Sequence, residues 1–266
     1  MCPIWQVGPC WMASHRLKLN QQKTEFLWIG SWNTLSKLPN GGPQLVLESC
    51  TVPVSGEARC LGVIIEPDLS MKRHVQTVSR ACFYQLRQLK SIRHSVDSET
   101  ASTLVHAFVT SRLDYCNSLL AGCPKVVTDV LQKVQNAAAR LLTGSSRRQH
   151  GIQQIMHQKL HWLNITDRIR FKLCLIVYKS LHGLSPRYLS ELVTPVAGSE
   201  YRHRLRSATH GDLVIPEARL TTYGHRSFSY AGAKAWNALP NHLKDHSLTL
   251  DAFKRGLKTH FLSSYL

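Results

Sequence analysis

The feature that most constrains this chain is a change in the spacing of its apolar residues near residue 71. Before that point, short apolar runs end at or contain glycine, and after it apolar residues recur at every third or fourth position. The first pattern is typical of short strands and the second of amphipathic helices. The sequence therefore predicts a mainly helical α+β fold, in which a small sheet precedes a helical bundle and a helical carboxy-terminal region.

Three apolar runs predict strands in the first part of the chain. They lie at residues 25–30, 45–47 and 60–65, and the second follows a turn sequence at 39–43. Three short strands have little apolar surface to bury against one another. Residues 1–70 are therefore interpreted as the remnant of a larger sheet.

The following residues predict three neighbouring helices. The first carries an apolar stripe from Val75 to Ile92, and Asp97 suits the amino-terminal cap of the second. Pro124 suits the first turn of the third helix, which should stop near Gly144. The buried side of the second helix is predicted to hold Leu104, Ala107, Phe108, Ser111, Tyr115 and Leu119. Short connections between such helices favour packing as a bundle.

Two further signals complete the predicted organisation. Thr166 is expected to cap a fourth helix that closes at Gly183 and Pro186, and helical patterns return around Trp236 and from Phe253 onwards. The polar and basic residues 194–225 between them read as a linker. Three regions follow: 1–70, a helical domain at 71–193, and a linker with a helical extension at 194–266.

The charge of the chain is concentrated in its helical part. Residues 1–70 hold five of the 33 Lys/Arg and five of the 16 Asp/Glu, so residues 71–266 carry the whole net charge of +17. A field of this size favours polyanionic partners, above all nucleic acid, although a solvated basic face is the simpler alternative.

Other classes of protein find little support in the sequence. The eight cysteines form no C-x-x-C pair, and no apolar run is long enough for a membrane span. An intracellular protein of the cytoplasm or nucleus, without a membrane or small-molecule partner, is expected. The pairs His157/His161 and His242/His246 have zinc-like spacing, but neither has a third ligand, so no metal site is predicted. Phosphate-loop, serine-hydrolase and zinc-protease motifs are missing as well.

Polymerase chemistry lacks its usual carboxylates. Two-metal nucleotide transfer needs acidic side chains close together, yet the first aspartate is Asp68 and no two aspartates lie within three positions of each other. This chain alone has no recognisable metal cradle.

Several collinear segments nevertheless resemble the reverse transcriptases of non-LTR (LINE-type) retrotransposons. Residues 17–25, LKLNQQKTE, resemble the element after that family's catalytic centre, and residues 60–63, CLGV, look like its primer-side strand. Residues 106–117 and 131–140 resemble its thumb segments. The likeness continues at 160–163, 168–172, 223–228 and 236–240.

The resemblance implies the end of a polymerase palm, a thumb that binds primer–template duplex, and a carboxy-terminal extension. The family's paired aspartates, which hold Mg²⁺ in the intact polymerase, would precede residue 17 and are missing from this chain. We therefore expect a truncated, catalytically inactive reverse-transcriptase-like protein without a cofactor. The alternative is a non-enzymatic helical interaction module, domesticated or inert.

The same resemblance implies five site residues. Lys23 corresponds to the lysine beside the incoming nucleotide, and Gly62 lies in the primer-facing strand. Arg112, Lys133 and Arg140 are implied phosphate contacts. A solvent-exposed loop lysine, an ordinary buried strand and ordinary helix-surface cations are the structural alternatives.

Overall fold

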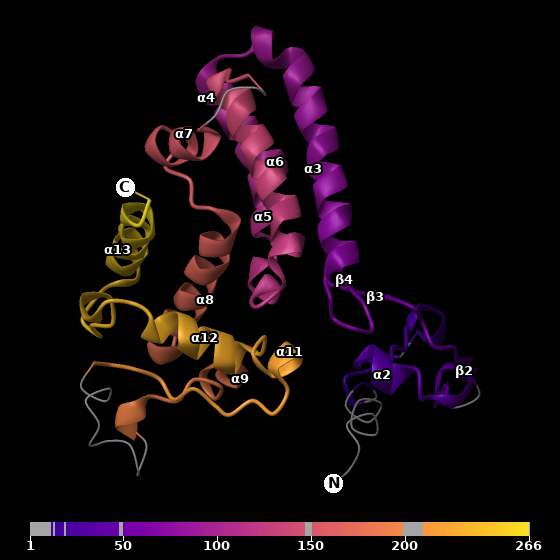
Figure 1. Cartoon of the computed structure of the whole chain (residues 1–266). Helices are drawn as coiled ribbons and strands as arrows, with labels where there is room; N and C mark the ends of the chain where they lie inside the picture. The colour runs from indigo at the N-terminus through magenta and orange to yellow at the C-terminus, as the bar shows by residue number, and fades with distance from the viewer. Residues whose placement is uncertain are drawn as a thin grey trace. The chain divides into compact units, whose positions relative to one another are not determined.

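The computed structural model describes residues 12, 14–18, 20–47, 50–146, 151–198 and 210–265. By its internal contacts the chain divides into two units, Met1–His74 and Val75–Leu266 (Figure 1). The described residues are mostly helical, with two small antiparallel strand pairs, in agreement with a mainly helical α+β fold. The division at residues 70 and 193 inferred from the sequence stays a prediction.

The amino-terminal unit contains short elements only. They are η1 (Gln21–Lys23), α2 (Trp32–Leu35), η2 (Pro39–Gly41), β1 (Leu45–Leu47), β2 (Cys50–Val52), β3 (Ala58–Cys60) and β4 (Val63–Ile65). Strand β1 pairs antiparallel with β2, and β3 pairs antiparallel with β4. The unit therefore holds two hairpin-like pairs and, among its described residues, no larger sheet.

Only one of the three predicted strands is confirmed over its full length. Residues 45–47 form β1, but the run at 25–30 contributes only an isolated parallel bridge from Phe26 to Val54. The predicted strand at 60–65 is confirmed only at residues 63–65, which form β4, because Leu61 and Gly62 adopt φ angles of +47° and +84° and turn the chain between β3 and β4. Two consecutive residues with positive φ are the backbone requirement of a tight hairpin turn.

The first helices of the carboxy-terminal unit form an up–down–up arrangement (Figure 1). Its elements are α3 (Lys72–Ile92), η3 (Arg93–Ser95), α4 (Ser98–Val105), the π-helical η4 (His106–Thr110), α5 (Ser111–Asp114), η5 (Asn117–Leu120) and α6 (Lys125–Thr143). Two predicted helix ends are confirmed, whereas Pro124, predicted in the first turn of the third helix, is the residue just before α6. The Asp97 carboxylate accepts a hydrogen bond from the Thr100 amide at 2.6 Å, and Gly144 ends α6 with a φ of +68°.

The predicted buried side of the second helix is wrong. Phe108, Tyr115 and Leu119 are 41%, 52% and 50% exposed, whereas the buried positions are Ala101, Val105, Val109 and Leu113. These buried residues are spaced by four, and the chain passes through the π-helical turn η4 between them. A π-turn contains more residues than an α-turn, so it moves the buried face away from the positions that a regular α-helical period predicts.

The longest of the remaining elements is α8 (Ile165–Leu181), and seven shorter elements complete the described part of the unit. They are α7 (Ile152–Gln158), α9 (Arg187–Ser190), η6 (Val196–Gly198), α11 (Thr221–Gly224), α12 (Phe228–Asn237), η7 (Asn241–Leu243) and α13 (Leu250–Ser263). Helix α8 contacts α6, α12 and α13. Its amino-terminal cap is Asn164 rather than the predicted Thr166, and α7 had no clear signal in the sequence.

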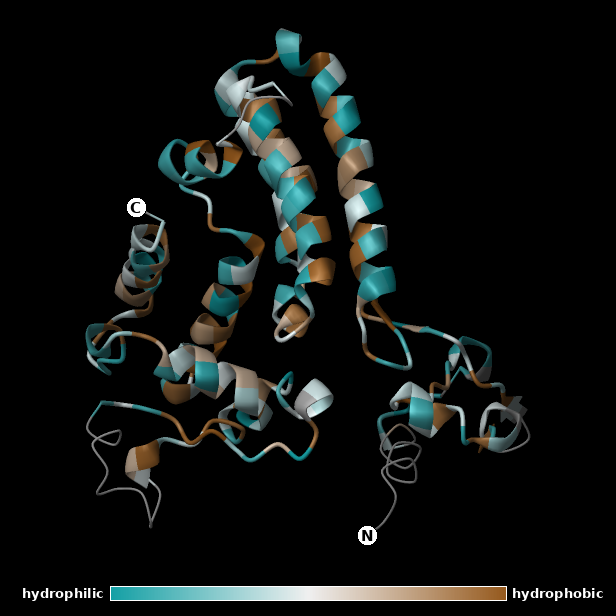
Figure 2. Cartoon of the chain, viewed as in Figure 1, coloured by the Kyte–Doolittle hydropathy of each residue, from teal (hydrophilic) through white to brown (hydrophobic). Residues whose placement is uncertain are grey.

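One apolar core joins α8, α12 and α13. Val177, Trp236 and Phe253 are at its centre, each no more than 1% exposed. Apolar and polar positions are interleaved along α3, α6 and α8 (Figure 2), as expected of helices that bury one face. In the described part of the chain, no helix combines the length and the apolar character that a membrane crossing requires.

Candidate nucleic-acid interface

A groove of about 820 Å³ lies between α3, η3 and the carboxy-terminal end of α6. It is lined by Phe83, Leu86, Arg87, Lys90, Arg93, His94, Ala137, Arg140, Leu141, Gly144 and Ser145. Four of these residues are lysine or arginine, and none carries a carboxylate. The groove is therefore an acid-free concentration of positive charge on an already basic unit.

Helical spacing produces both the floor and the cationic walls of the groove. On α3, Phe83, Arg87 and Lys90 follow one another at intervals of three and four, beside the buried Leu86. On α6, Ala137, Arg140 and Leu141 lie on one face in the same way. Residues three and four apart share a helix face, so each helix presents apolar and cationic groups together.

One of the four cations has a structural task. Arg93 donates hydrogen bonds to the carbonyl oxygens of Leu141 at 3.4 Å and Val96 at 3.0 Å, and to the Ser98 hydroxyl at 3.3 Å. It thereby ties the last turns of α6 to the connection between α3 and α4. Its guanidinium satisfies carbonyl groups near a helix end, where cations are favourable.

The other three cations lack such partners within the described ranges. Arg87 and Lys90 are exposed and take part in no hydrogen bond or ion pair there, and the Nε atom of Arg140 is buried without an acceptor. A buried donor without an acceptor is costly and rare in proteins. These three side chains are free to bind an anion, and phosphate oxygens are the acceptors that guanidinium groups suit best.

The residues predicted in the thumb segments are only partly brought together. Arg140 lines the groove, and Lys133 is exposed seven residues earlier on α6, which is about two helical turns away on a similar face. Arg112 is exposed on α5 and does not line the groove.

Burial raises the pKa of the Cys82 thiol to about 11, and the charge of Arg112 acts in the opposite direction on that group.

Lys23 and Gly62 belong to the amino-terminal unit. Lys23 is the exposed last residue of η1, and its amide donates to the Asn20 side chain at 3.2 Å. Gly62 is an exposed turn residue rather than part of a strand, so the predicted primer-facing strand is not formed there.

Nearby carboxylates of the amino-terminal unit hold the backbone in place. Glu25 accepts the Arg59 amide at 2.8 Å, and Glu66 accepts the Arg73 amide at 3.1 Å. Glu57 pairs with the Arg73 guanidinium at 3.0 Å. These acidic groups thus have protein partners, and the described residues contain no cluster of metal-ligating side chains.

Sequence reasoning missed the α3 side of the groove. Arg87, Lys90 and Arg93 were recognisable as cations outside the apolar stripe of α3, but nothing in the sequence placed them opposite Arg140. Phe83 was not singled out either. The only available signal was the repeat of positive charge near the ends of two predicted helices.

Other polar residues of the resembling segments serve the fold. Arg168 forms a two-pronged ion pair with Asp114, at 2.9 and 2.7 Å, which joins α8 to α5. The indole of Trp236 donates to the Gly211 carbonyl at 2.9 Å, and the Asn237 side chain exchanges two 2.8 Å hydrogen bonds with the Leu213 backbone. These contacts position one helix or segment against another.

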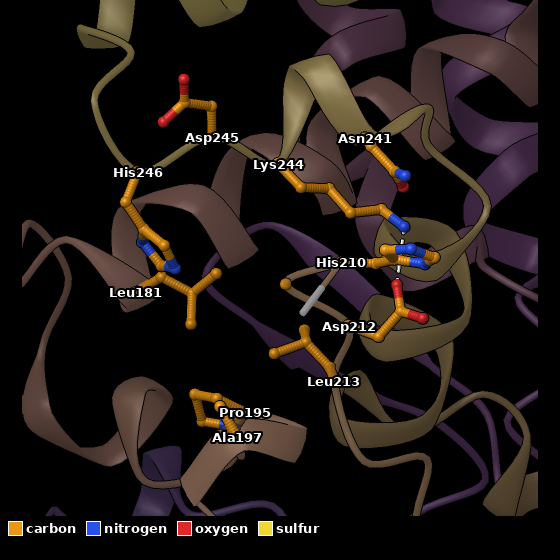
Figure 3. Close-up of a pocket in the computed structure, with 11 residues that line it drawn as sticks. Leu181, Pro195, Ala197, His210, Asp212, Leu213, Asn241, Lys244, Asp245 and His246 are labelled. Carbon is orange, nitrogen blue, oxygen red and sulfur yellow. Dashed lines mark hydrogen bonds and ion pairs between the residues drawn. The ribbon is translucent and has the colours of Figure 1, made fainter. Parts of the chain in front are cut away.

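A second pocket, of about 500 Å³, lies beside the end of α8 and η7 (Figure 3). Its lining includes His210, Asp212, Lys244, Asp245 and His246. The ammonium group of Lys244 contacts the Asp212 carboxylate at 2.6 Å and the Asn237 carbonyl at 3.0 Å. Lys244 is therefore already neutralised and is not available to a ligand in the way that the groove cations are.

The histidine pairs do not form the arrangement that their spacing suggested. His157 lies in α7, but His161 lies beyond its end with a φ of +50°. His242 lies in η7, and His246 lies after it. Neither pair therefore projects from one face of a helix.

The α3–α6 groove is the candidate site that the geometry of the described residues favours. It combines free cations, an apolar floor and the absence of competing carboxylates, and it lies on the unit that carries the excess charge. Comparisons with protein-family models, with curated proteins and with solved structures give no match to this chain.

Proposed function

We propose that this chain is a reverse-transcriptase-like protein that binds primer–template nucleic acid through its helical unit and does not itself polymerise nucleotides. The observation that carries the proposal is the α3–α6 groove, where Arg87, Lys90 and Arg140 are without protein partners among the described residues. Phosphate groups would supply the missing acceptors. The collinear resemblance to non-LTR reverse transcriptases supports the same reading, with 1–70 as palm remnant and the following helices as thumb.

The absence of polymerisation in this proposal rests on the acidic residues. The carboxylates of Glu25, Glu57 and Glu66 are engaged by backbone amides or by Arg73. Among the described residues, no acidic side chains gather into a cluster of the kind that holds two metal ions against a triphosphate. Templated nucleotide incorporation by the purified chain would contradict this part of the proposal.

Binding of a primer–template probe at several salt concentrations tests the nucleic-acid part. Phosphate contacts release counterions, so the affinity should fall steeply as salt rises. The double variant R87Q/K90Q should bind more weakly and with a shallower salt dependence. Its matched control is R255Q/K258Q on α13, which removes the same charge at the same i,i+3 spacing from an exposed helix face outside the groove.

Comparison of the two double variants distinguishes binding at the groove from attraction by the net charge of the protein. If both double variants weaken binding equally, net charge alone explains the affinity and the groove is not the site. An affinity that does not depend on salt would exclude phosphate contacts altogether.

A second candidate function, a non-enzymatic interaction module, is favoured by the amino-terminal unit. Trp32, Val46 and Leu61 are 80%, 66% and 85% exposed there. Where such side chains gather into one patch, the patch is typical of a surface that binds a partner. The substitution W32S should improve solubility of the purified chain if this surface is unpartnered, and salt-dependent nucleic-acid binding should remain unchanged.

A further inference from the structure

The α3–α6 groove has an apolar floor as well as cationic walls. Phe83 is 38% exposed, Leu86 is 7% exposed, and Ala137 and Leu141 are partly buried beside them. A site for phosphate alone gains nothing from an exposed phenyl ring. An aromatic face between cations is the combination that stacks an unpaired base while its backbone is neutralised.

A duplex makes poor use of this floor. Its bases are stacked inside, and a protein meets mainly phosphates, sugars and base edges. An unpaired strand exposes the faces of its bases to an aromatic ring. The floor of the groove therefore complements a single strand better than it complements a duplex.

The size of the groove leads to the same conclusion. Pockets of about 300–1,000 Å³ enclose ligands of drug-like size, and this groove measures about 820 Å³. Such a space admits a small number of unpaired nucleotides. A helical turn of duplex is too bulky to enter it and would rest on its rim.

The cations flank the floor from both helices. Arg87 and Lys90 lie on α3, with a rise of roughly 4.5 Å between them, and Arg140 lies on α6. The buried Nε atom of Arg140 needs an acceptor that the described residues do not supply. A phosphate oxygen of a strand lying in the groove can instead accept a hydrogen bond from the part of the Arg140 guanidinium that lines the groove.

From these observations we infer that the groove binds a single unpaired nucleic-acid strand, such as the overhang of a primer–template, with a base against Phe83 and phosphates on Arg87, Lys90 and Arg140. The inference rests on the proposed function and adds the strand type to it. It makes Phe83 the residue that determines preference for unpaired strands.

Fluorescence anisotropy with the full chain tests this inference. The probes are oligothymidine, oligouridine of the same length, and a blunt duplex, all at one salt concentration. The variant F83L keeps an apolar side chain in the helix but removes the aromatic ring. The variant F83W keeps an aromatic ring at this position and makes it larger. Its control is Y84L on the adjacent residue, which is 54% exposed and does not line the groove.

We expect F83L to weaken binding of the single strands at least about fivefold, the lower end of the loss measured when stacked aromatic residues are removed. F83W and Y84L should both bind the single strands with about the affinity of the wild type. None of the three variants should change the affinity for the blunt duplex. In R87Q/K90Q, the slope of log affinity against log salt for the single strand should fall by about 1.4, because two phosphate contacts are lost.

The failures of the two proposals are distinguishable. If the blunt duplex binds with a steep salt dependence that R87Q/K90Q reduces, while F83L changes neither probe, the proposed function stands and the single-strand inference is wrong. Equal losses in F83L and Y84L would likewise overturn the assignment of Phe83. If no probe binds in a salt-dependent manner, both proposals fall together.

Discussion

The two ends of the carboxy-terminal unit use their charged residues in opposite ways. Around α8, α12 and α13, several charged groups that are at least partly buried have protein partners: Lys244 pairs with Asp212, Arg168 with Asp114, and the Tyr265 hydroxyl with Asp167. In the α3–α6 groove, only Arg93 has protein acceptors among the described residues. We call these regions the α8 core and the groove.

The difference separates residues that hold the fold from residues that are left for a ligand. A paired buried charge is costly to disrupt, because removing one partner leaves the other uncompensated. An exposed, unpaired cation contributes little to stability and in a basic unit even opposes it by repulsion. Substitutions in the α8 core should therefore lower stability strongly. Substitutions in the groove should weaken nucleic-acid binding and leave stability nearly unchanged.

The largest loss of stability is expected from W236A in the α8 core. Trp236 is 1% exposed, lies near Phe253 and donates a hydrogen bond to Gly211. Removing such a side chain should lower the free energy of unfolding by about 4 kcal/mol through lost burial and a new cavity. Urea titration followed by circular dichroism measures the change.

Trp32 offers the matched control for this substitution. It is 80% exposed on α2, so W32A should change the free energy of unfolding by less than about 0.5 kcal/mol. A comparable loss in both variants would mean that the α8 core is not the main source of stability.

The substitution K244M should have the next largest effect. It strands the Asp212 carboxylate, whose side chain is only 20% exposed, and deprives the Asn237 carbonyl of a donor. We expect a loss of about 3 kcal/mol in the free energy of unfolding. K258M on the exposed face of α13 is the control, and the double variant D212N/K244M should recover part of the loss, since the stranded charge is removed.

A smaller, pH-dependent effect is expected at the cap of α4. Hydrogen bonds from Thr100 hold the pKa of Asp97 below its ordinary value of 3.8. Because the folded pKa is the lower one, the cap stabilises the protein fully above pH 3.8 and loses this contribution as pH falls through the folded value. The urea midpoint of D97A should lie below that of the wild type at neutral pH and converge with it in acid. A constant difference at every pH would exclude the carboxylate as its source.

The smallest change in stability is expected in the groove. R87Q/K90Q should alter the free energy of unfolding by less than about 0.5 kcal/mol, and any change should be stabilising because like charges are removed. Thermal unfolding at low salt measures it. A marked destabilisation would show that these cations hold the fold, and the contrast between the groove and the α8 core would disappear.

Much of the helical part could be predicted from the sequence. Asp97 and Gly144 marked helix ends because a carboxylate that accepts a backbone amide and a residue with positive φ are local requirements. The spacing of apolar residues at every third or fourth position correctly predicted α3, α6, α8 and α13. These are short-range signals, and they do not depend on what the helix packs against.

The wrong predictions of secondary structure and burial lie where a turn interrupts a regular apolar pattern. The run at 60–65 reads as one strand, but the positive φ angles of Leu61 and Gly62 fold it back on itself. The π-helical turn η4 shifts the buried face between α4 and α5, so Phe108 and Tyr115 are exposed. A hairpin turn inside an apolar run and a π-turn inside a helix leave the pattern of apolar residues unchanged. The sequence therefore contained no signal for either turn.

The sequence alone determined that a basic, mainly helical region follows a short strand-bearing one, because charge and apolar period are properties of the chain itself. Only the tertiary structure decided which cations are free. Lys244 and Arg168 meet carboxylates far away in the sequence, whereas Arg140 meets the cations of α3 across an apolar floor. Pairing depends on the packing of distant elements, so identical residue types stabilise the fold in one place and remain available to a ligand in another.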